Sequence, residues 1–258
     1  MIEALFLDVD GTLLSFRTHR VSESARAALC EAHARGVRIF IATGRAAGDL
    51  APLEGLPYDG VVALNGAECV LRDGRVVARR PILRADFERG LELAARFGFP
   101  VALELDEGIF VDRVTPEVER LAALVAHPVP ETADLRRLFD RNVCCQMCFY
   151  CDERVERAVM AELPGLAATR WHPIFADITV RGVDKASGMR DMLAACSLGA
   201  DAAMACGDGG NDVPMLRAAG VGVAMGNGCD PAKQAADYVT ADVDDDGLAK
   251  ALKYYHVI

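Results

Sequence analysis

The sequence predicts an α/β fold in which a doubly wound parallel sheet is interrupted by an inserted α+β segment. In the first and last thirds, short apolar runs end in acidic residues or glycine, and helical patterns lie between them. This alternation stops in the middle of the chain and then resumes. The length of 258 residues is sufficient for a core domain and an inserted domain.

The first third alternates strand and helix. The run 4–9 is almost entirely apolar and leads into acidic residues, which is typical of a buried parallel strand. Ser22 is placed to cap a helix that ends at Gly36. The next strands are predicted at 37–42 and 60–64. This βαβαβ order predicts parallel strands with helices on both faces.

The last third resumes the same alternation. A helix is predicted to follow Lys185, and a short apolar strand at 202–206 leads into Gly207 and Asp208. A helix around Met215, a strand at 221–225 and a closing helix at 248–254 complete the predicted core.

The segment 83–180 has a different pattern. It combines helical stretches with a predicted β-hairpin around Asp106-Glu107-Gly108 and further strands near Trp171 and Ile178. Helices combined with antiparallel strands indicate an α+β insertion. We therefore predict a core formed by 1–82 and 181–258, with an inserted domain at 83–180.

Four cysteines lie close together in the insertion, at 144, 145, 148 and 151, and their C-x-x-C spacings also occur in zinc sites. The surrounding segment is predicted to be a strand, however, and residues three apart on a strand point to opposite faces. Cys145 and Cys148 would then not share a metal. We interpret the four cysteines as small apolar residues.

Composition excludes several classes of protein. Hydrophobic residues make up 52% of the chain, as in a packed globular protein and not a disordered one. A formal net charge of −10 argues against non-specific binding to nucleic acid or to an anionic membrane surface. Neither a signal peptide nor a membrane span is recognisable, so we expect a cytoplasmic location.

Two carboxylates follow the first predicted strand. Asp8 and Asp10 are two residues apart on an extended segment, so their side chains are expected to face the same way. Gly11 allows the chain to turn away sharply. Ligands of open α/β sheets bind at the carboxyl ends of the strands, so this pair is expected at the active edge. Clustered carboxylates repel each other unless a cation or a proton lies between them.

A second acidic group follows the strand at 202–206, where Asp208, Asn211 and Asp212 add carboxylate and amide oxygens at the same edge. Ligation by oxygen alone suits Mg²⁺. Thr43 and Gly44 end the second strand with a hydroxyl and backbone N–H groups that can hold phosphoryl oxygens. Lys185 can supply positive charge to a dianion.

Each feature also has an ordinary structural explanation. The Asp pair, the Thr-Gly dipeptide and the glycine-rich run could be turns, and a lysine at a helix start is usually solvated. Their order, each at a strand or helix end, is difficult to explain by packing alone.

With these four motifs, Asp8-Val-Asp-Gly-Thr-Leu-Leu, Thr43-Gly-Arg, Lys185 and Gly207-Asp-Gly-Gly-Asn-Asp, the chain resembles the haloacid dehalogenase superfamily. It is most similar to the Cof-type sugar-phosphate phosphatases. The resemblance covers the whole core and implies a Rossmann-like fold. It also implies that 83–180 is an α/β cap that closes over the active site.

The resemblance further implies a role for each matched residue. Asp8 would be the nucleophile that forms an aspartyl-phosphate, and Asp10 the general acid and base. Asp8, the Asp10 carbonyl and Asp208 would hold Mg²⁺, with Asp212 supporting that site. The phosphoryl group would be bound by Thr43, Gly44, Lys185 and Asn211. The implied activity is hydrolysis of small phosphorylated metabolites.

Two alternatives remain at this point. A phosphomutase of the phosphomannomutase type shares this core and cap, but would need a second phosphate site in the insertion, where several arginines lie. A phosphorylatable signalling module also uses clustered aspartates, a threonine and a lysine, but is about half this length. The physiological substrate and the oligomeric state cannot be read from the sequence.

Overall fold

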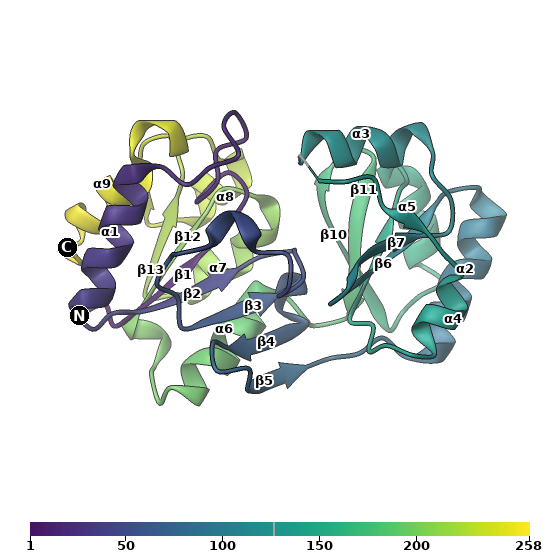
Figure 1. Cartoon of the computed structure of the whole chain (residues 1–258), viewed down its shortest axis with the longest axis horizontal. Helices are drawn as coiled ribbons and strands as arrows, with labels where there is room; N and C mark the ends of the chain where they lie inside the picture. Colours follow the sequence, from purple (N-terminus) through teal and green to yellow (C-terminus); the bar gives the residue numbers. More distant parts are fainter. Residues whose placement is uncertain (126) are drawn as a thin grey trace. The chain divides into compact units, whose positions relative to one another are not determined.

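The computed structural model describes residues 1–125 and 127–258. It consists of two compact units, one formed by Met1–Ala78 and Asp184–Ile258 and the other by Arg79–Val183 (Figure 1). The chain crosses between them at 78/79 and 183/184, whereas the sequence suggested 82/83 and 180/181.

The first unit is built on an eight-stranded sheet with the order β14-β13-β12-β1-β2-β3-β4-β5. The strands from β14 to β3 are parallel, and β4 runs antiparallel to β3. The strands are β1 (Ala4–Leu7), β2 (Arg38–Ala42), β3 (Gly60–Ala63), β4 (Glu68–Leu71), β5 (Val76–Arg79), β12 (Ala203–Gly207), β13 (Val221–Ala224) and β14 (Tyr238–Val239).

Helices cover both faces of this sheet, which confirms the predicted doubly wound architecture. They are α1 (Glu23–Ala34), α6 (Lys185–Ala195), α7 (Val213–Ala218), α8 (Asp230–Ala235) and α9 (Gly247–Tyr254), with five 3₁₀ turns at Ala51–Leu53, Leu64–Gly66, Ala200–Ala202, Gly210–Asp212 and Val243–Asp245. Phe6 and Phe40 share a core cluster with residues of α6, α7 and α8. Leu5 and Leu7 point to the other face by strand alternation.

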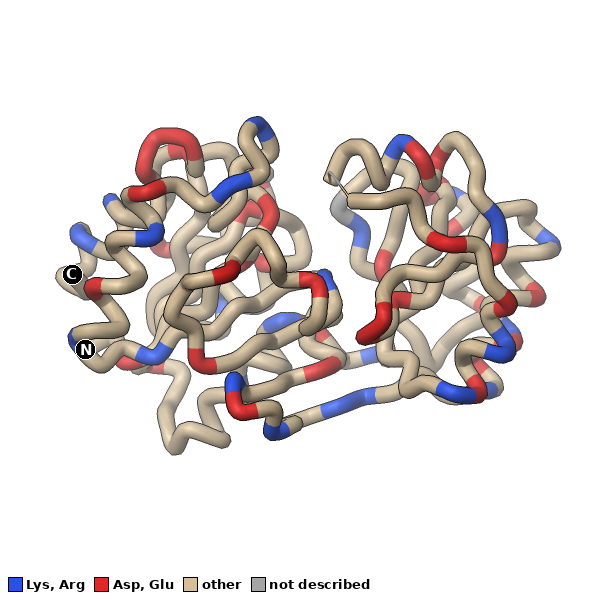
Figure 2. Tube along the Cα trace, in the orientation of Figure 1, with Lys and Arg blue, Asp and Glu red and all other residues tan. Residues whose placement is uncertain are grey.

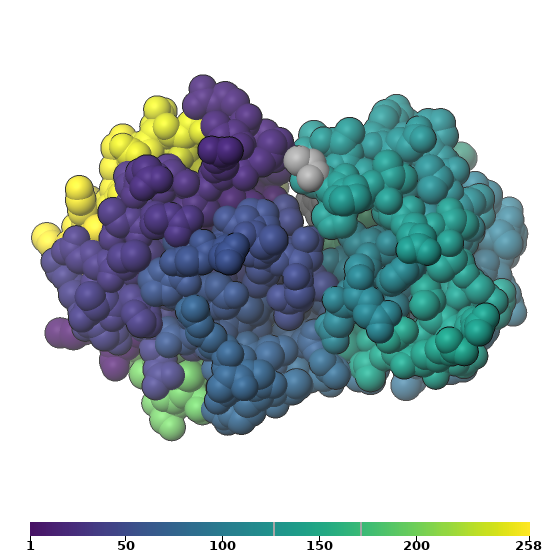
Figure 3. All heavy atoms as spheres, in the orientation of Figure 1, coloured from purple at the N-terminus to yellow at the C-terminus, as the bar shows by residue number. Residues whose placement is uncertain are grey.

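On that other side, α1 packs against α9. The space-filling view accordingly shows the C-terminal residues (yellow) beside the N-terminal ones (purple) on the surface of this unit (Figure 3).

Local sequence accounts for where several elements begin. The Ser22 hydroxyl accepts a hydrogen bond from the Ala25 N–H and caps α1, as predicted. Asp184 caps α6 in a capping box with Ser187, which places Lys185 at the first helical position. The sequence did not predict β4 and β5. They follow a tight turn in which Leu64 and Asn65 both have positive φ.

The second unit contains a six-stranded sheet with the order β10-β11-β9-β6-β7-β8. Its strand pairs are antiparallel except β7 with β8. The strands are β6 (Val101–Leu105), β7 (Gly108–Val111), β8 (Glu131–Thr132), β9 (Gln146–Phe149), β10 (Leu166–His172) and β11 (Phe175–Val180); the helices are α2 (Arg84–Phe97), α3 (Pro116–Leu124), α4 (Leu135–Phe139) and α5 (Glu153–Met160).

The two faces of this sheet differ. Residues such as Leu103, Met147 and Ile178 form a large apolar cluster with α2, α4 and α5. Ala102 and Cys148 belong to a smaller cluster on the opposite face, which includes residues of α3. Cys144 and Cys151 lie in the large cluster, so Cys148 is on the other face of the sheet.

No helix among residues 1–125 and 127–258 is both long and apolar enough to cross a bilayer. Basic and acidic residues are interspersed along the traces of both units (Figure 2).

Candidate active site

Asp8 and Asp208 are brought together because β1 and β12 are neighbouring parallel strands. Each aspartate directly follows the carboxyl end of its strand, and the Asp8 N–H donates to the Cys206 carbonyl at 3.0 Å. Gly11 has a φ of 89°, and a Cβ atom there would overlap the Asp208 carboxylate. Glycine is therefore required where the chain turns past Asp208. The Thr12 hydroxyl donates to Asp208 Oδ1 at 3.3 Å.

Lys185 links this pair to Asp212. Its Nζ lies 2.6 Å from Asp8 Oδ1 and 2.6 Å from Asp212 Oδ1, and the side chain is completely buried. A buried ammonium is stable only with opposite charges close to it. The two carboxylates outweigh the effect of burial and raise the pKa of Lys185, so the ammonium remains protonated.

Asp212 organises the loop that carries Asp208. Its Oδ2 accepts hydrogen bonds from the N–H groups of Asp208 and Gly209, at 2.9 and 2.8 Å. Because its Oδ1 is bonded to Lys185, both oxygens of this fully buried carboxylate are engaged. These contacts fit a residue that positions its neighbours better than one that binds a metal directly.

The site holds three carboxylates and one ammonium, so negative charge is in excess. Burial and the charge of Asp212 raise the pKa of Asp208 to about 7. Burial, followed by the charge of Asp212, also raises the pKa of Asp8 well above its ordinary value, although Lys185 opposes the shift. Oxygen atoms of Asp8, Asp208 and Asp212 all lie within 4.8 Å of one another. An excess of clustered oxygen charge is what a hard divalent cation requires.

Asp10 has a different partner. Its carboxylate accepts two hydrogen bonds from Arg45, from Nε at 2.8 Å and from Nη2 at 2.7 Å. Arg45 also donates to Asp49 at 3.3 Å. Such a bidentate pair fixes the orientation of both groups. The side chain of Asp10 is thus held by Arg45, whereas Asp8 belongs to the group around Lys185.

Thr43 and Asn211 are connected through Asn65. The Asn65 N–H donates to the Thr43 carbonyl at 2.9 Å, and its side-chain oxygen accepts from Asn211 Nδ2 at 3.1 Å. Asn65 adopts a φ of 52°, a backbone region that asparagine tolerates better than most residues. The Thr43 hydroxyl accepts from the Arg45 N–H at 3.1 Å, which orders the turn through Gly44.

Sequence reasoning assigned no role to three residues that position this site. They are Arg45, Asn65 and Asn227; the last donates to the Gly11 carbonyl at 2.7 Å and accepts from the Val243 N–H at 2.9 Å. Arg45 follows Thr43-Gly44 directly, so its position beside this dipeptide, which was expected to bind phosphate, was the available signal. Asn65 and Asn227 are each followed by glycine, a pattern that by itself indicates only a turn.

A parallel sheet with a buried lysine and clustered aspartates at its carboxyl edge defines an enzyme of the phosphoryl-transfer class. Residues 5–252 match the family of haloacid dehalogenase-like hydrolases, and the chain belongs to this family. It is a phosphoric monoester hydrolase, of a family that generally uses a divalent metal. The family match also excludes the signalling module considered from the sequence.

Three similar proteins illustrate the match. "Putative phosphatase YkrA" of Bacillus subtilis is 30% identical over 251 residues, which cover 96% of each chain. The structure of BT1666 from Bacteroides thetaiotaomicron, a phosphatase of this superfamily, is 56% identical with a TM-score of 0.95, covering 100% of this chain and 96% of that one. The subclass IIB sugar phosphatase BT4131 is 35% identical with a TM-score of 0.92, covering 99% of this chain and 100% of that one.

Proposed function

We propose that this protein is a Mg²⁺-dependent phosphatase that hydrolyses small phosphate monoesters, such as sugar phosphates, through an aspartyl-phosphate on Asp8. The observation that carries the proposal is the buried contact of Lys185 with Asp8 and Asp212 beside Asp208. The description of BT4131 as a sugar phosphatase supports the substrate class.

In the first step, an oxygen of Asp8 attacks the phosphorus, and the bond between phosphorus and the ester oxygen breaks. Asp10 gives its proton to the departing oxygen, so the leaving group departs as an alcohol. The backbone at Gly44, the Thr43 hydroxyl, Lys185 and Asn211 would bind the phosphoryl oxygens.

In the second step, Asp10 takes a proton from water, and the water oxygen attacks the phosphorus of the aspartyl-phosphate. The bond from phosphorus to Asp8 breaks, which releases phosphate and restores the carboxylate. Mg²⁺, held by Asp8, the Asp10 carbonyl and Asp208, would supply charge neutralisation for the phosphoryl group.

Asp10 must exchange partners during this cycle. Its carboxylate is bonded to both Nε and Nη2 of Arg45. We infer that this is a resting arrangement, and that Asp10 takes up a proton from solvent as it turns from Arg45 to the ester oxygen when substrate binds. The proton that it takes from water in the second step is released to solvent when Asp10 returns to Arg45.

We also propose that the insertion, predicted at 83–180, is a cap that selects the substrate. The phosphomutase alternative would require arginines in this region that can hold a second phosphate. Several of those arginines are already engaged: Arg113 pairs with Asp112, Arg136 with Glu88 and Arg170 with Glu156, while Arg181 donates to the Pro164 carbonyl. These contacts favour the phosphatase.

The metal assignment is tested by assaying hydrolysis of nitrophenyl phosphate and a panel of sugar phosphates. After treatment with EDTA we expect little activity, and Mg²⁺ should restore it. Full activity in the presence of chelator would contradict the metal assignment. Mass spectrometry of rapidly quenched enzyme should locate a phosphoryl group on the peptide that contains Asp8.

A further inference from the structure

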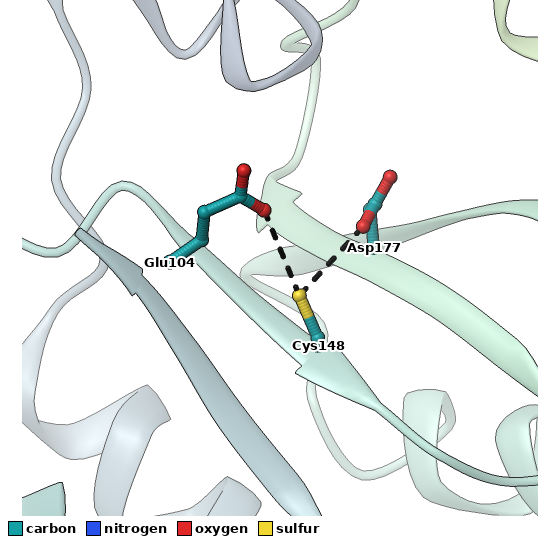
Figure 4. A group of neighbouring side chains, drawn as sticks. All are labelled: Glu104, Cys148 and Asp177. Atoms are coloured by element: carbon teal, nitrogen blue, oxygen red, sulfur yellow. Dashed lines mark hydrogen bonds between the residues drawn. The ribbon is translucent and has the colours of Figure 1, made fainter. Parts of the chain in front are cut away.

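A second group of potential ligands lies in the unit formed by Arg79–Val183. Glu104 on β6, Cys148 on β9 and Asp177 on β11 project from adjacent strands toward one another (Figure 4). All three side chains are buried. Cys148 is opposite Asp177 in one strand pair and opposite Ala102, two residues before Glu104, in the other. The antiparallel sheet thus holds two carboxylates around one thiol.

The separations are close to those in a tetrahedral metal site. Cys148 Sγ lies 3.9 Å from Glu104 Oε2 and 3.8 Å from Asp177 Oδ1, and ligand atoms of the three residues all lie within 4.8 Å of one another. Bond lengths of about 2.3 Å to sulfur and 2.0 Å to oxygen imply a sulfur–oxygen separation of about 3.5 Å around Zn²⁺. Each separation to sulfur would need to shorten by only a few tenths of an ångström.

The side chain of Gln146, on the same face of the sheet, contacts both carboxylates. Gln146 Nε2 donates to Glu104 Oε2 at 2.8 Å and to Asp177 Oδ1 at 3.3 Å, which orients both carboxylates. The amide and the thiol are both neutral donors.

Thr179 supplies an independent observation. It follows Asp177 by two residues on β11, so it lies on the same face, and Ile178, between them, is opposite Met147, the residue after Gln146. Its hydroxyl is buried, with only 1% of the residue exposed, and it has no hydrogen-bond partner in the part of the chain that the structure describes. Such hydroxyls are usually satisfied by an ordered water or an ion.

We propose that Glu104, Cys148 and Asp177 form a binding site for a borderline divalent cation of the Zn²⁺ class. A thiolate ligand favours Zn²⁺ or Co²⁺ over Mg²⁺, which prefers oxygen ligands only. Binding replaces the thiol proton, which passes to solvent, and a water completes the fourth position near Thr179. The ion joins three strands and stabilises the sheet of this unit. The site differs from the C-x-x-C arrangement that was rejected from the sequence, because it uses one cysteine and two acids, and it gives Cys148 a role beyond that of a small apolar residue.

Co²⁺ titration of the full-length protein tests the site, since cobalt bound to a thiolate has a charge-transfer absorption in the near ultraviolet. Oxygen ligands alone, as at Asp8 and Asp208, do not produce this band. With excess Mg²⁺ present to occupy the site at Asp8 and Asp208, we expect the band to saturate at one equivalent and to disappear on addition of Zn²⁺. Cys148→Ser should abolish it, and Glu104→Gln should weaken Co²⁺ binding by about 10- to 100-fold.

Cys144→Ser is the matched control, because Cys144 is also buried but belongs to the apolar cluster on the opposite face. This variant should keep the band. A wild-type protein without the band, or a band that persists in Cys148→Ser, would overturn the proposal. Should Cys148→Ser fail to fold, Glu104→Gln and Asp177→Asn decide the matter, since unchanged Co²⁺ affinity in both would refute it.

Discussion

Replacing Asp212 by asparagine changes one carboxylate oxygen of a completely buried side chain into an NH₂ group. The native carboxylate accepts from Lys185 through Oδ1 and from two backbone N–H groups through Oδ2. All three partners are donors. An amide has one accepting oxygen, so in either orientation its NH₂ group faces a donor.

The loss of stability is set by the amide orientation that has the smaller free-energy cost. If the amide oxygen faces the backbone, the Lys185 contact is lost; if it faces Lys185, both backbone bonds are lost. A hydrogen bond that involves a charged group contributes about 1.5–3 kcal/mol. The substitution also removes repulsion with Asp8 and Asp208, which offsets part of the loss. We therefore expect the free energy of unfolding to fall by about 1–3 kcal/mol.

Denaturant unfolding in EDTA measures this loss of stability without bound metal. A Mg²⁺ titration of activity should show that Asp212→Asn binds Mg²⁺ about 10- to 100-fold more weakly than the wild type. Asp237→Asn is a suitable control, since Asp237 accepts from the Gly222 N–H at 2.8 Å and an amide oxygen can replace that acceptor. If Asp212→Asn changed both stability and Mg²⁺ affinity no more than Asp237→Asn does, the positioning role of Asp212 would be refuted.

Three other predictions follow from the same site and from the insertion. Asp8→Asn should reduce turnover to background, whereas Asp10→Asn should lose about 10²- to 10⁴-fold on sugar phosphates and less on nitrophenyl phosphate, whose leaving group needs no proton; equal losses on both substrates would reject the acid role. In EDTA, the pKa of Asp8 is raised and that of Asp208 is raised to about 7, so stability should fall as the pH rises from about 4 through 7. A carboxylate with a raised folded-state pKa contributes stability that is complete below its unfolded pKa and is lost as the pH rises through its folded pKa. Thermal unfolding should accordingly show a Mg²⁺ stabilisation that grows over this range and is smaller in Asp208→Asn; a stabilisation that shrinks with rising pH would contradict the charge argument. Replacing 79–183 by a short linker should leave a folded core that hydrolyses small activated esters but discriminates poorly among metabolites, and failure of that core to fold would show that the insertion is integral to it.

The sequence alone predicted most core elements, because their signals are local. The strands β1 and β12 are short apolar runs that stop at Asp8 and Asp208, and Ser22 marks the start of α1. The strand ends also predicted the candidate site residues, since parallel strands carry ligands at their carboxyl ends. In contrast, β4 and β5 were missed, because Asn65-Gly66 indicates a turn but not that the chain after it returns antiparallel to β3.

The contacts within the site required the tertiary structure. Lys185 is 177 residues from Asp8 in the chain, and only the packing of α6 against the sheet, beside β3 and β4, places its ammonium 2.6 Å from that carboxylate. The partner of Asp10 was likewise not predictable, because Arg45 reaches it from the turn after β2.

The segment that contains Cys144, Cys148 and Cys151 shows which features the sequence predicts and which depend on the tertiary structure. Alternation along a strand predicted that cysteines three apart would point to different faces, and Cys148 and Cys151 do lie on different faces. Alternation alone would put Cys144 on the same face as Cys148; it lies on the other face because the strand is shorter than expected, β9 covering only Gln146–Phe149. That Cys148 lies between Glu104 and Asp177 was decided by the strand order β11-β9-β6. Sequence periodicity determines which face of a strand a side chain occupies, but its neighbours on that face come from strands distant in the chain, and only the folded sheet brings them together.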